Sequence, residues 1–387
     1  MVATITRQST YSIVCPTLPD AGEIIGDIRA VFESGRVTVG ENVAALEGDN
    51  CAHSGVRHTI AVSSGTSGLI LLLRALNLPR GSEVITPSFT FAATSHALIW
   101  NGLKTVFCDS EPDSFTMDVS KAEALINENT SAIYPVCIFG VPGDLDAYEK
   151  LASKYGLALL FDSAQGLGST YKGTGLGNFG NGEVFSLSPT KVITAMEGGL
   201  VTTNDDELAR VIRQMRDYGK APDGEDMGWL GLSARMPEIN AIVARWSLAR
   251  MDEWVARRIS IMDSYRSWLG DLPGVSFQKI PDYCTSTRNY FVMLLNPDMC
   301  PVSRDELYHA LKIKGVQTKR YFYPALHNQT LYKDTDPECR ARLPVAERIA
   351  ARSLALPMYS HMSLDAVDDI CERIMSCFTS ATIRPAM

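Results

Sequence analysis

Between about residues 58 and 205, short β-like runs alternate along the chain with helix-like runs. This alternation is typical of a mostly parallel sheet that is covered by helices on both faces. We expect strands at residues 58–62, 83–87, 104–109, 132–139, 157–162, 183–187 and 199–203, and helices at residues 63–78, 93–100, 119–129, 144–156 and 206–219.

After about residue 217 the pattern changes. A loop rich in Gly, Pro and acidic residues is followed by helical periodicity over residues 236–269, which predicts one long helix linking two domains. We therefore predict an α/β protein with a large cofactor-binding domain at residues 1–250, which includes the N-terminal segment and the linking helix. A smaller α+β domain follows at residues 251–387, with a strand at 289–295 and helices at 304–315, 344–354 and 364–375.

Composition narrows the functional classes. The chain has 387 residues, 45% of them apolar, so it can bury a substantial core and is expected to be soluble and globular. Its net charge of -8 and the lack of a Lys/Arg run argue against nucleic-acid or membrane-surface partners. The most apolar run, residues 69–78, is too short to span a bilayer, and residues 1–20 lack the apolar core of a signal peptide, so we predict a cytoplasmic protein.

The nine cysteines are scattered singly, with no C-x-x-C pair. This pattern indicates neither a metal site nor a disulfide framework, and we expect small buried or partly buried side chains at these positions.

Polar residues directly after predicted strands are the first candidates for function, because ligands of parallel sheets bind beyond the carboxyl ends of the strands. SSGTSG at 63–68 could offer backbone N–H groups to a phosphate, or could be an ordinary helix cap. Asp162 follows an apolar run and could face a cation, or could cap a turn. Lys191 lies in a small-residue turn between two strands and is followed by Gly198 and Gly199.

A phosphate site, a buried carboxylate and a lysine are the three parts that pyridoxal phosphate requires. The carboxylate keeps the pyridine nitrogen protonated, and the lysine binds the cofactor covalently. A competing motif, G-x-G-x-x-G at Gly175, Gly177 and Gly180, precedes a strand rather than a helix, so it does not predict a dinucleotide site.

Ordered motifs over nearly the whole chain resemble those of the DegT/DnrJ/EryC1/StrS sugar aminotransferases, which are fold-type-I pyridoxal-phosphate enzymes. They lie at residues 63–69, 86–94, 162–173, 185–191, 197–205, 234–241, 323–327 and 354–359. The resemblance implies phosphate contacts from Gly65, Thr66 and Ser186, ring stacking by Phe91, a ring-nitrogen contact from Asp162, a position beside the ring for Gln165, and covalent binding by Lys191. For Phe91, core packing is the alternative.

Two positions depart from the family pattern. Ser233 stands where the family usually has an asparagine that reaches the cofactor phosphate of the neighbouring subunit, so Ser233 is the corresponding, shorter cofactor-binding candidate. Asn181 replaces a frequent aspartate. The resemblance also implies a homodimer with shared active sites.

The resemblance implies transfer of an amino group from glutamate or glutamine to a keto group of a nucleotide-linked deoxysugar. The alternatives are a free cyclitol or keto-sugar acceptor and a non-catalytic regulatory homologue. Members that dehydrate sugars usually have histidine in place of Lys191, which argues against that activity. Candidate substrate residues are Tyr321, Tyr323, His327 and Tyr332, with Arg213 and Arg216 as further candidates; all of them could equally be surface or packing residues.

Overall fold

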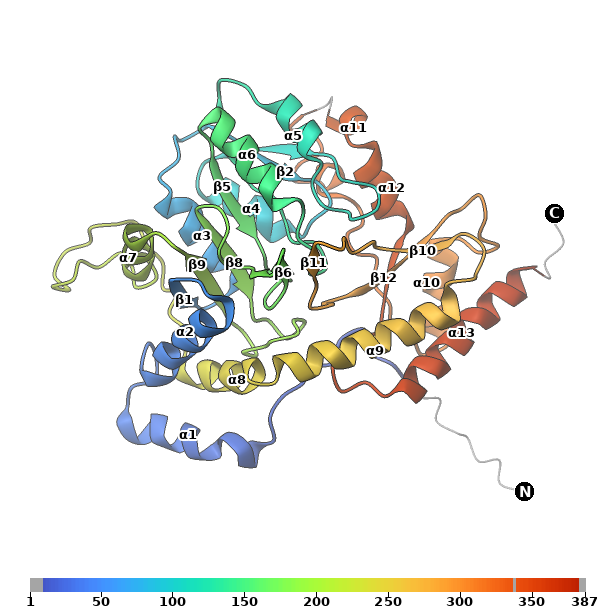
Figure 1. The fold of residues 1–387 in the computed structure, drawn as a ribbon, viewed down its shortest axis with the longest axis horizontal. Helices are drawn as coiled ribbons and strands as arrows, with labels where there is room; N and C mark the ends of the chain where they lie inside the picture. The colour runs from blue at the N-terminus through green and yellow to red at the C-terminus, as the bar shows by residue number, and fades with distance from the viewer. Residues whose placement is uncertain (1–9, 337–338, 383–387) are drawn as a thin grey trace.

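A seven-stranded sheet forms the centre of the protein, seen here in a computed structural model that describes residues 10–336 and 339–382 (Figure 1). Its strand order is β1-β9-β8-β5-β4-β2-β3. The strands are β1 (His58–Val62), β2 (Glu83–Pro87), β3 (Lys104–Cys108), β4 (Thr130–Ile133), β5 (Ala158–Asp162), β8 (Gly182–Ser186) and β9 (Gly199–Thr203).

All seven strands were predicted, with two differences. β9 runs antiparallel to both of its neighbours, so the sheet is mostly rather than wholly parallel. β4 ends at Ile133 instead of continuing to residue 139. Pro135 follows, and a proline has no N–H with which to continue a ladder.

Helices cover both faces of this sheet, and each face has its own apolar core. One face carries α3 (Gly65–Ala75), α4 (Ala92–Trp100) and α7 (Asp206–Met215). The other carries α2 (Glu41–Ser54), α5 (Val119–Leu125), α6 (Leu145–Tyr155) and α8 (Glu238–Leu248), and α1 (Ala21–Ser34) packs on α8.

The single long helix predicted over residues 236–269 is wrong: the structure has two helices, α8 and α9 (Met251–Leu269). At the break the Arg250 N–H bonds to the carbonyl of Ser247, three residues back, which tightens the turn. The Ser247 hydroxyl accepts a hydrogen bond from the Thr194 N–H (3.0 Å), and the Arg250 guanidinium lies 4.1 Å from the centre of the Trp246 ring. These tertiary contacts override a continuous helical pattern.

The C-terminal part has a second, antiparallel sheet of β10 (Val275–Phe277), β12 (Phe291–Leu295) and β13 (Ser353–Leu356). On one side it packs with α9, α10 (Arg304–Ile313) and α13 (Leu364–Thr382). This part also contains α12 (Pro344–Arg352), the short helix α11 (Cys339–Arg342) and the 3-10 helix η1 (Leu326–Asn328). A small sheet joins β11 (Cys284–Thr285) to β6 (Thr170–Tyr171) and β7 (Thr174–Gly175).

The division at residues 250 and 251 stays a prediction. It coincides with the break between α8 and α9, but Tyr11, from the N-terminal segment assigned to the large domain, pairs with Val316 of the C-terminal part. Residues 1–9, which include half of the segment assessed for a signal peptide, and residues 383–387 lie outside the described chain.

All nine cysteines are free, six of them buried and three partly buried, as predicted. Within residues 10–336 and 339–382, no helix has both the length and the apolar character that a membrane crossing requires.

Candidate active site

A cavity of about 320 Å³ lies beyond the carboxyl ends of the parallel strands. Segments from four places in the large sheet reach it: the start of α3, the turn between β2 and α4, the turn after β5, and the connection between β8 and β9. It contains all the cofactor residues that were predicted within one subunit, namely Gly65, Thr66, Phe91, Asp162, Gln165, Ser186 and Lys191. Their individual roles stay predictions.

The start of α3 is a capped helix end that also leaves backbone N–H groups available to an anion, so the two interpretations of this motif do not exclude each other. The Ser64 hydroxyl accepts the Ser67 N–H and the Ser67 hydroxyl accepts the Ser64 N–H, both at 3.1 Å. Gly65 and Thr66 come first in the helix, so their N–H groups have no carbonyl partner within it. A Cβ on Gly65 would lie 2.9 Å from the Cβ of Ser186, which explains the glycine.

Asp162 ends β5, and its side chain is 4% exposed. It accepts hydrogen bonds from the Thr94 hydroxyl (2.6 Å) and the Ala164 N–H (3.1 Å). Burial raises the pKa of this carboxyl, against the opposing effects of Thr94, Ala164 and Lys191. A cationic ligand group would remove much of that penalty, so the carboxylate suits a protonated ring nitrogen.

Lys191 lies in the connection between β8 and β9, as predicted. Its N–H bonds to the Ser188 carbonyl (3.0 Å), and the segment is closed by a bond from Leu187 N–H to the Gly198 carbonyl (2.9 Å). A Cβ on Gly199 would lie 2.7 Å from the backbone nitrogen of Gly65. The second glycine of the pair thus brings the lysine connection against the anion site.

Phe91 is 59% exposed although it is aromatic, and it lines the cavity. The core-packing alternative therefore does not describe it. Phe322 pairs with it at 6.2 Å between ring centres. Gln165 accepts the Phe139 N–H (2.8 Å), which fixes its side chain in the cavity wall.

Several residues of the site were not predicted from the sequence. Thr94 is buried and does not line the cavity, but its hydroxyl donates a hydrogen bond to Asp162. It lies within the motif at 86–94, one helical turn after Phe91, and this spacing was a local signal that could have marked it. Tyr290, Lys319 and Phe322 arrive from the C-terminal part, and no local pattern marks them.

Of the four candidate substrate residues, Tyr321 lines the cavity. Tyr323 is exposed and lies against Arg304, 4.5 Å from its ring centre to the guanidinium. His327 is buried and bonds to the Ser88 hydroxyl (2.6 Å). Tyr332 is buried and accepts the Ser95 hydroxyl (2.7 Å). The structure does not place these three side chains in the cavity wall.

The remaining candidates also lie elsewhere. Arg213 donates to the Thr59 carbonyl (3.3 Å), and Arg216 is buried in an ion pair with Glu47. Ser233 is exposed, outside the cavity of its own chain, and its backbone bridges to Asp217. Asn181 joins β5 to β8 by accepting the Leu159 N–H (2.9 Å).

The Gly175–Gly180 loop has a structural role. The buried carboxylate of Glu183, on β8, accepts the N–H groups of Gly177 (2.6 Å) and Phe179 (3.1 Å) and the hydroxyl of Ser163 (2.5 Å). Burial raises its pKa to about 7. Glu183 therefore ties this loop to the residue that follows Asp162.

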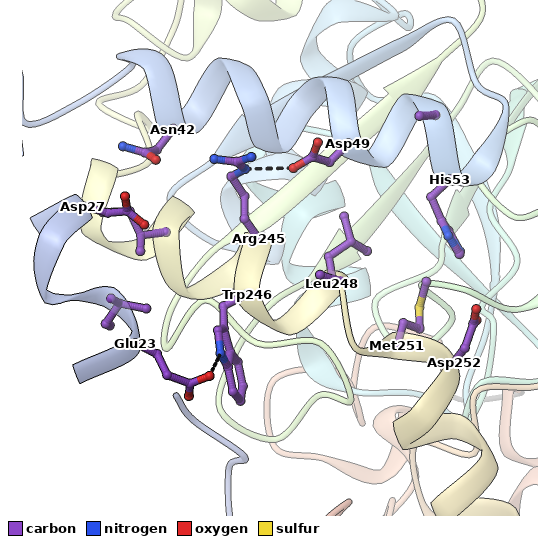
Figure 2. A pocket seen from close by; sticks show the side chains of 14 residues that line it. Glu23, Asp27, Asn42, Asp49, His53, Arg245, Trp246, Leu248, Met251 and Asp252 are labelled. Carbon is purple, nitrogen blue, oxygen red and sulfur yellow. Dashed lines mark hydrogen bonds and ion pairs between the residues drawn. The ribbon is translucent and has the colours of Figure 1, made fainter. Parts of the chain in front are cut away.

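A larger hollow, of about 640 Å³, opens between α1, α2 and α8 (Figure 2). Two contacts within the protein engage charged groups of its lining: Arg245 pairs with Asp49 (2.8 Å), and Glu23 accepts the Trp246 ring N–H (3.1 Å). Size alone does not make it the reaction site, because the reactive groups gather in the smaller cavity.

A mostly parallel sheet lies between two helical layers, and a helix start with free N–H groups, a buried carboxylate and a lysine meet at one edge of it, an arrangement that fits an α/β aminotransferase. The chain belongs to the DegT/DnrJ/EryC1/StrS aminotransferase family, whose model matches residues 20–375, and it is therefore an enzyme.

Solved structures agree with this assignment. DesI, crystallised in the presence of its TDP-sugar product, is 34% identical, with a TM-score of 0.89 over 96% of this chain and 93% of its own. DesV from S. venezuelae, in complex with a ketimine intermediate, is 30% identical, with a TM-score of 0.86 over 96% of this chain and all (100%) of its own. A DegT DnrJ EryC1 StrS aminotransferase from Brucella abortus is 30% identical, with a TM-score of 0.85 over 92% and 97%.

Proposed function

We propose that the enzyme uses pyridoxal phosphate to transfer an amino group from glutamate or glutamine to a keto group of a nucleotide-linked deoxysugar. The observation that carries this proposal is the meeting of the α3 start, Asp162 and Lys191 in one cavity. The TDP-sugar product named for DesI, which is similar over 96% of this chain, supports a sugar nucleotide as the acceptor.

The residues present fit the cofactor. The free N–H groups of Gly65 and Thr66 and the hydroxyl of Ser186 would hold its phosphate, and Phe91 offers an exposed flat face to a ring. Asp162 would hold the ring nitrogen protonated, since it is a buried carboxylate with a raised pKa and, among the residues that the structure describes, no cation is in hydrogen-bond contact with it. When bound, pyridoxal phosphate supplies an electron sink next to the reacting carbon.

The side chains then have separate tasks. Lys191 Nζ takes the α-proton of the donor and returns it, so it must alternate between ammonium and amine. Thr94 and the Ala164 N–H fix the Asp162 carboxylate in one orientation. Phe91 and Phe322 form an apolar wall that limits the entry of water.

The acceptor side of the cavity carries positive charge from Lys319, whose Nζ lies 5.2 Å from the ring centre of Tyr321. An ammonium group and a phenol suit the diphosphate and hydroxyl groups of a sugar nucleotide. This feature favours a charged acceptor over a free cyclitol or keto-sugar, which has no phosphate for Lys319 to bind.

We also propose a homodimer with shared active sites. The segment after α7 exposes Tyr218, Met227, Trp229, Leu230 and Leu232, with Leu230 70% exposed. A partner subunit would cover this apolar surface, and Ser233 at its end would then be placed to reach the partner's cofactor phosphate. The cytoplasmic location and the lack of nucleic-acid or membrane partners stay predictions from the sequence.

The proposed function is tested by incubating the purified enzyme with pyridoxal phosphate, glutamate or glutamine, and a panel of keto-sugar nucleotides and cyclitol ketones, with product masses read by mass spectrometry. We expect amination of a keto-sugar nucleotide. Amination of a cyclitol alone would replace the acceptor, and failure to bind pyridoxal phosphate or to accept any donor would favour the non-catalytic alternative.

A further inference from the structure

Tyr290 is a buried phenol beside Lys191 that the proposed chemistry has not used. It lies directly before β12, is 9% exposed and lines the cavity. Lys191 Nζ is 5.9 Å from the centre of its ring. The rings of Tyr321 and Phe139 pack against it, with centres at 5.0 and 5.9 Å, and leave it little freedom to move.

Cationic groups face Tyr290 from three different segments. Lys191 comes from the connection between β8 and β9, Lys319 from the C-terminal side of the cavity, and Arg258 from α9. Arg258 is buried, and its described hydrogen bonds go to the Ser360 hydroxyl and to the carbonyls of Arg288 and Asn289, none of which carries a charge. The carboxylates that line the same cavity are Asp162 and Glu197.

This surrounding makes the phenol of Tyr290 unusually acidic. Burial raises its pKa, but Lys191, the hydroxyls of Thr190 and Tyr321, and Lys319 lower it, and the net direction is downward. The neighbouring Tyr321 shows the opposite behaviour, because burial and Tyr290 itself raise its pKa. Tyr290 is thus the phenol of this pair that ionises first.

We propose that Tyr290 is the proton partner of Lys191. The phenolate oxygen of Tyr290 takes a proton from the Lys191 ammonium, which leaves a neutral phenol and a free amine, and the proton returns when the lysine must be cationic. The exchange conserves charge and needs no further reactant. This inference rests on the proposed function, because it assigns a source for the amine form of Lys191.

The ionisation itself is tested without any reaction. Near-ultraviolet absorbance of the full-length protein is titrated with pH for the wild type, Tyr290→Phe and Tyr134→Phe. Tyr134 is a matched control, since it is buried on the sheet, its hydroxyl has no hydrogen-bond partner among the described residues, and burial raises its pKa. We expect Tyr290→Phe to remove a phenol that ionises below the usual tyrosine value of about 10.

If the wild-type and Tyr290→Phe titrations do not differ by a phenol that ionises below that value, the proposal is overturned. Lys319→Met gives a second measurement that leaves Tyr290 in place: it removes one facing cation and should move the same titration to higher pH. An unchanged titration in Lys319→Met would count equally against the proposal.

The consequence for the reaction is measured with glutamate alone in a stopped-flow experiment over a range of pH. We expect Tyr290→Phe to bind cofactor normally but to react roughly 100-fold more slowly, with its rate rising only at higher pH, and Tyr134→Phe to match the wild type. A wild-type pH profile in Tyr290→Phe would refute the role. If the wild type reacted with no amino donor, the proposed function would be wrong. The absorbance titration would still show whether the pKa of Tyr290 is lowered.

Discussion

Replacing Glu183 by glutamine should remove a pH dependence of stability that the wild-type protein carries. Glu183 is 1% exposed, and its carboxylate has no cationic partner within residues 10–336 and 339–382. It accepts hydrogen bonds from Ser163, Gly177 and Phe179. Glutamine keeps an oxygen for the two backbone N–H groups, and its amide can donate to the Ser163 hydroxyl, so the loop should stay in place.

The magnitude follows from the two pKa values. Burial raises the pKa of Glu183 to about 7 in the folded protein, against about 4.3 for an unfolded glutamate. Between these values the folded state holds a proton that the unfolded state has lost, so the stability contributed by the protonated acid is complete below about pH 4 and is lost as the pH rises through about 7. At ~1.4 kcal/mol per pH unit, the complete loss is roughly 3.7 kcal/mol.

The assay is urea unfolding followed by tryptophan fluorescence at pH 5 and pH 8, on protein from which any cofactor has been removed, because a bound cofactor adds its own stabilisation. Most of this loss falls between pH 5 and pH 8, so we expect the difference in unfolding free energy between the two pH values to be about 2.5 kcal/mol smaller in Glu183→Gln than in the wild type. Glu149→Gln is the matched control, because Glu149 is exposed and lies at the same loop.

Equal pH dependence in Glu183→Gln and the wild type would refute the argument. A pH dependence that Glu149→Gln abolished as completely would show that the effect belongs to the loop surface rather than to the buried carboxylate.

Lys191→Ala should abolish transamination and leave the fold intact, since it removes the amine without opening a core cavity; borohydride should fix the cofactor of the wild type onto Lys191, and label on another lysine would contradict this. Asp162→Asn should keep the hydrogen bond from Ala164 and bind cofactor, yet react with glutamate slower by orders of magnitude, each tenfold being about 1.4 kcal/mol; a near wild-type stopped-flow rate would return Asp162 to a turn cap. Gly65→Ala should weaken cofactor binding in a spectroscopic titration, because its Cβ would lie 2.9 Å from Ser186 Cβ; unchanged affinity would remove Gly65 from the phosphate site. Ser233→Ala should reduce activity only weakly, by roughly 1 kcal/mol or less, in a protein that sedimentation shows to be a dimer; full activity of a verified monomer would contradict the shared site.

The sequence predicted the positions of the large-domain strands and of Asp162 and Lys191, because strand ends are local features. Apolar runs of strand length bounded by small and polar residues mark where a buried strand stops. Strand direction was not accessible in the same way. Nothing in residues 199–203 distinguishes the antiparallel β9 from its parallel neighbours.

The other half of the cavity could not be predicted, because it depends on packing between distant segments. Tyr290 and Lys319 lie about a hundred residues beyond Lys191 in the chain, and they meet it only when the C-terminal part folds against the large sheet. The break between α8 and α9 is of the same kind, since Ser247, next to the end of α8, accepts a hydrogen bond from the distant Thr194.

The two-part origin of the cavity gives a protein engineer two separate sets of positions. Asp162, Thr94 and Lys191 come from the strands, helices and connections of the large sheet, and Thr94 bonds to Asp162, whereas Lys319 and Phe322 bring their side chains in from the other part of the chain. A library that randomises Lys319 and Phe322 would explore new ketones with Asp162 and Lys191 left in place, and its changes at Lys319 would also shift the ionisation of Tyr290. A library of equal size at Thr94 and Asp162 would be filled mainly with inactive variants.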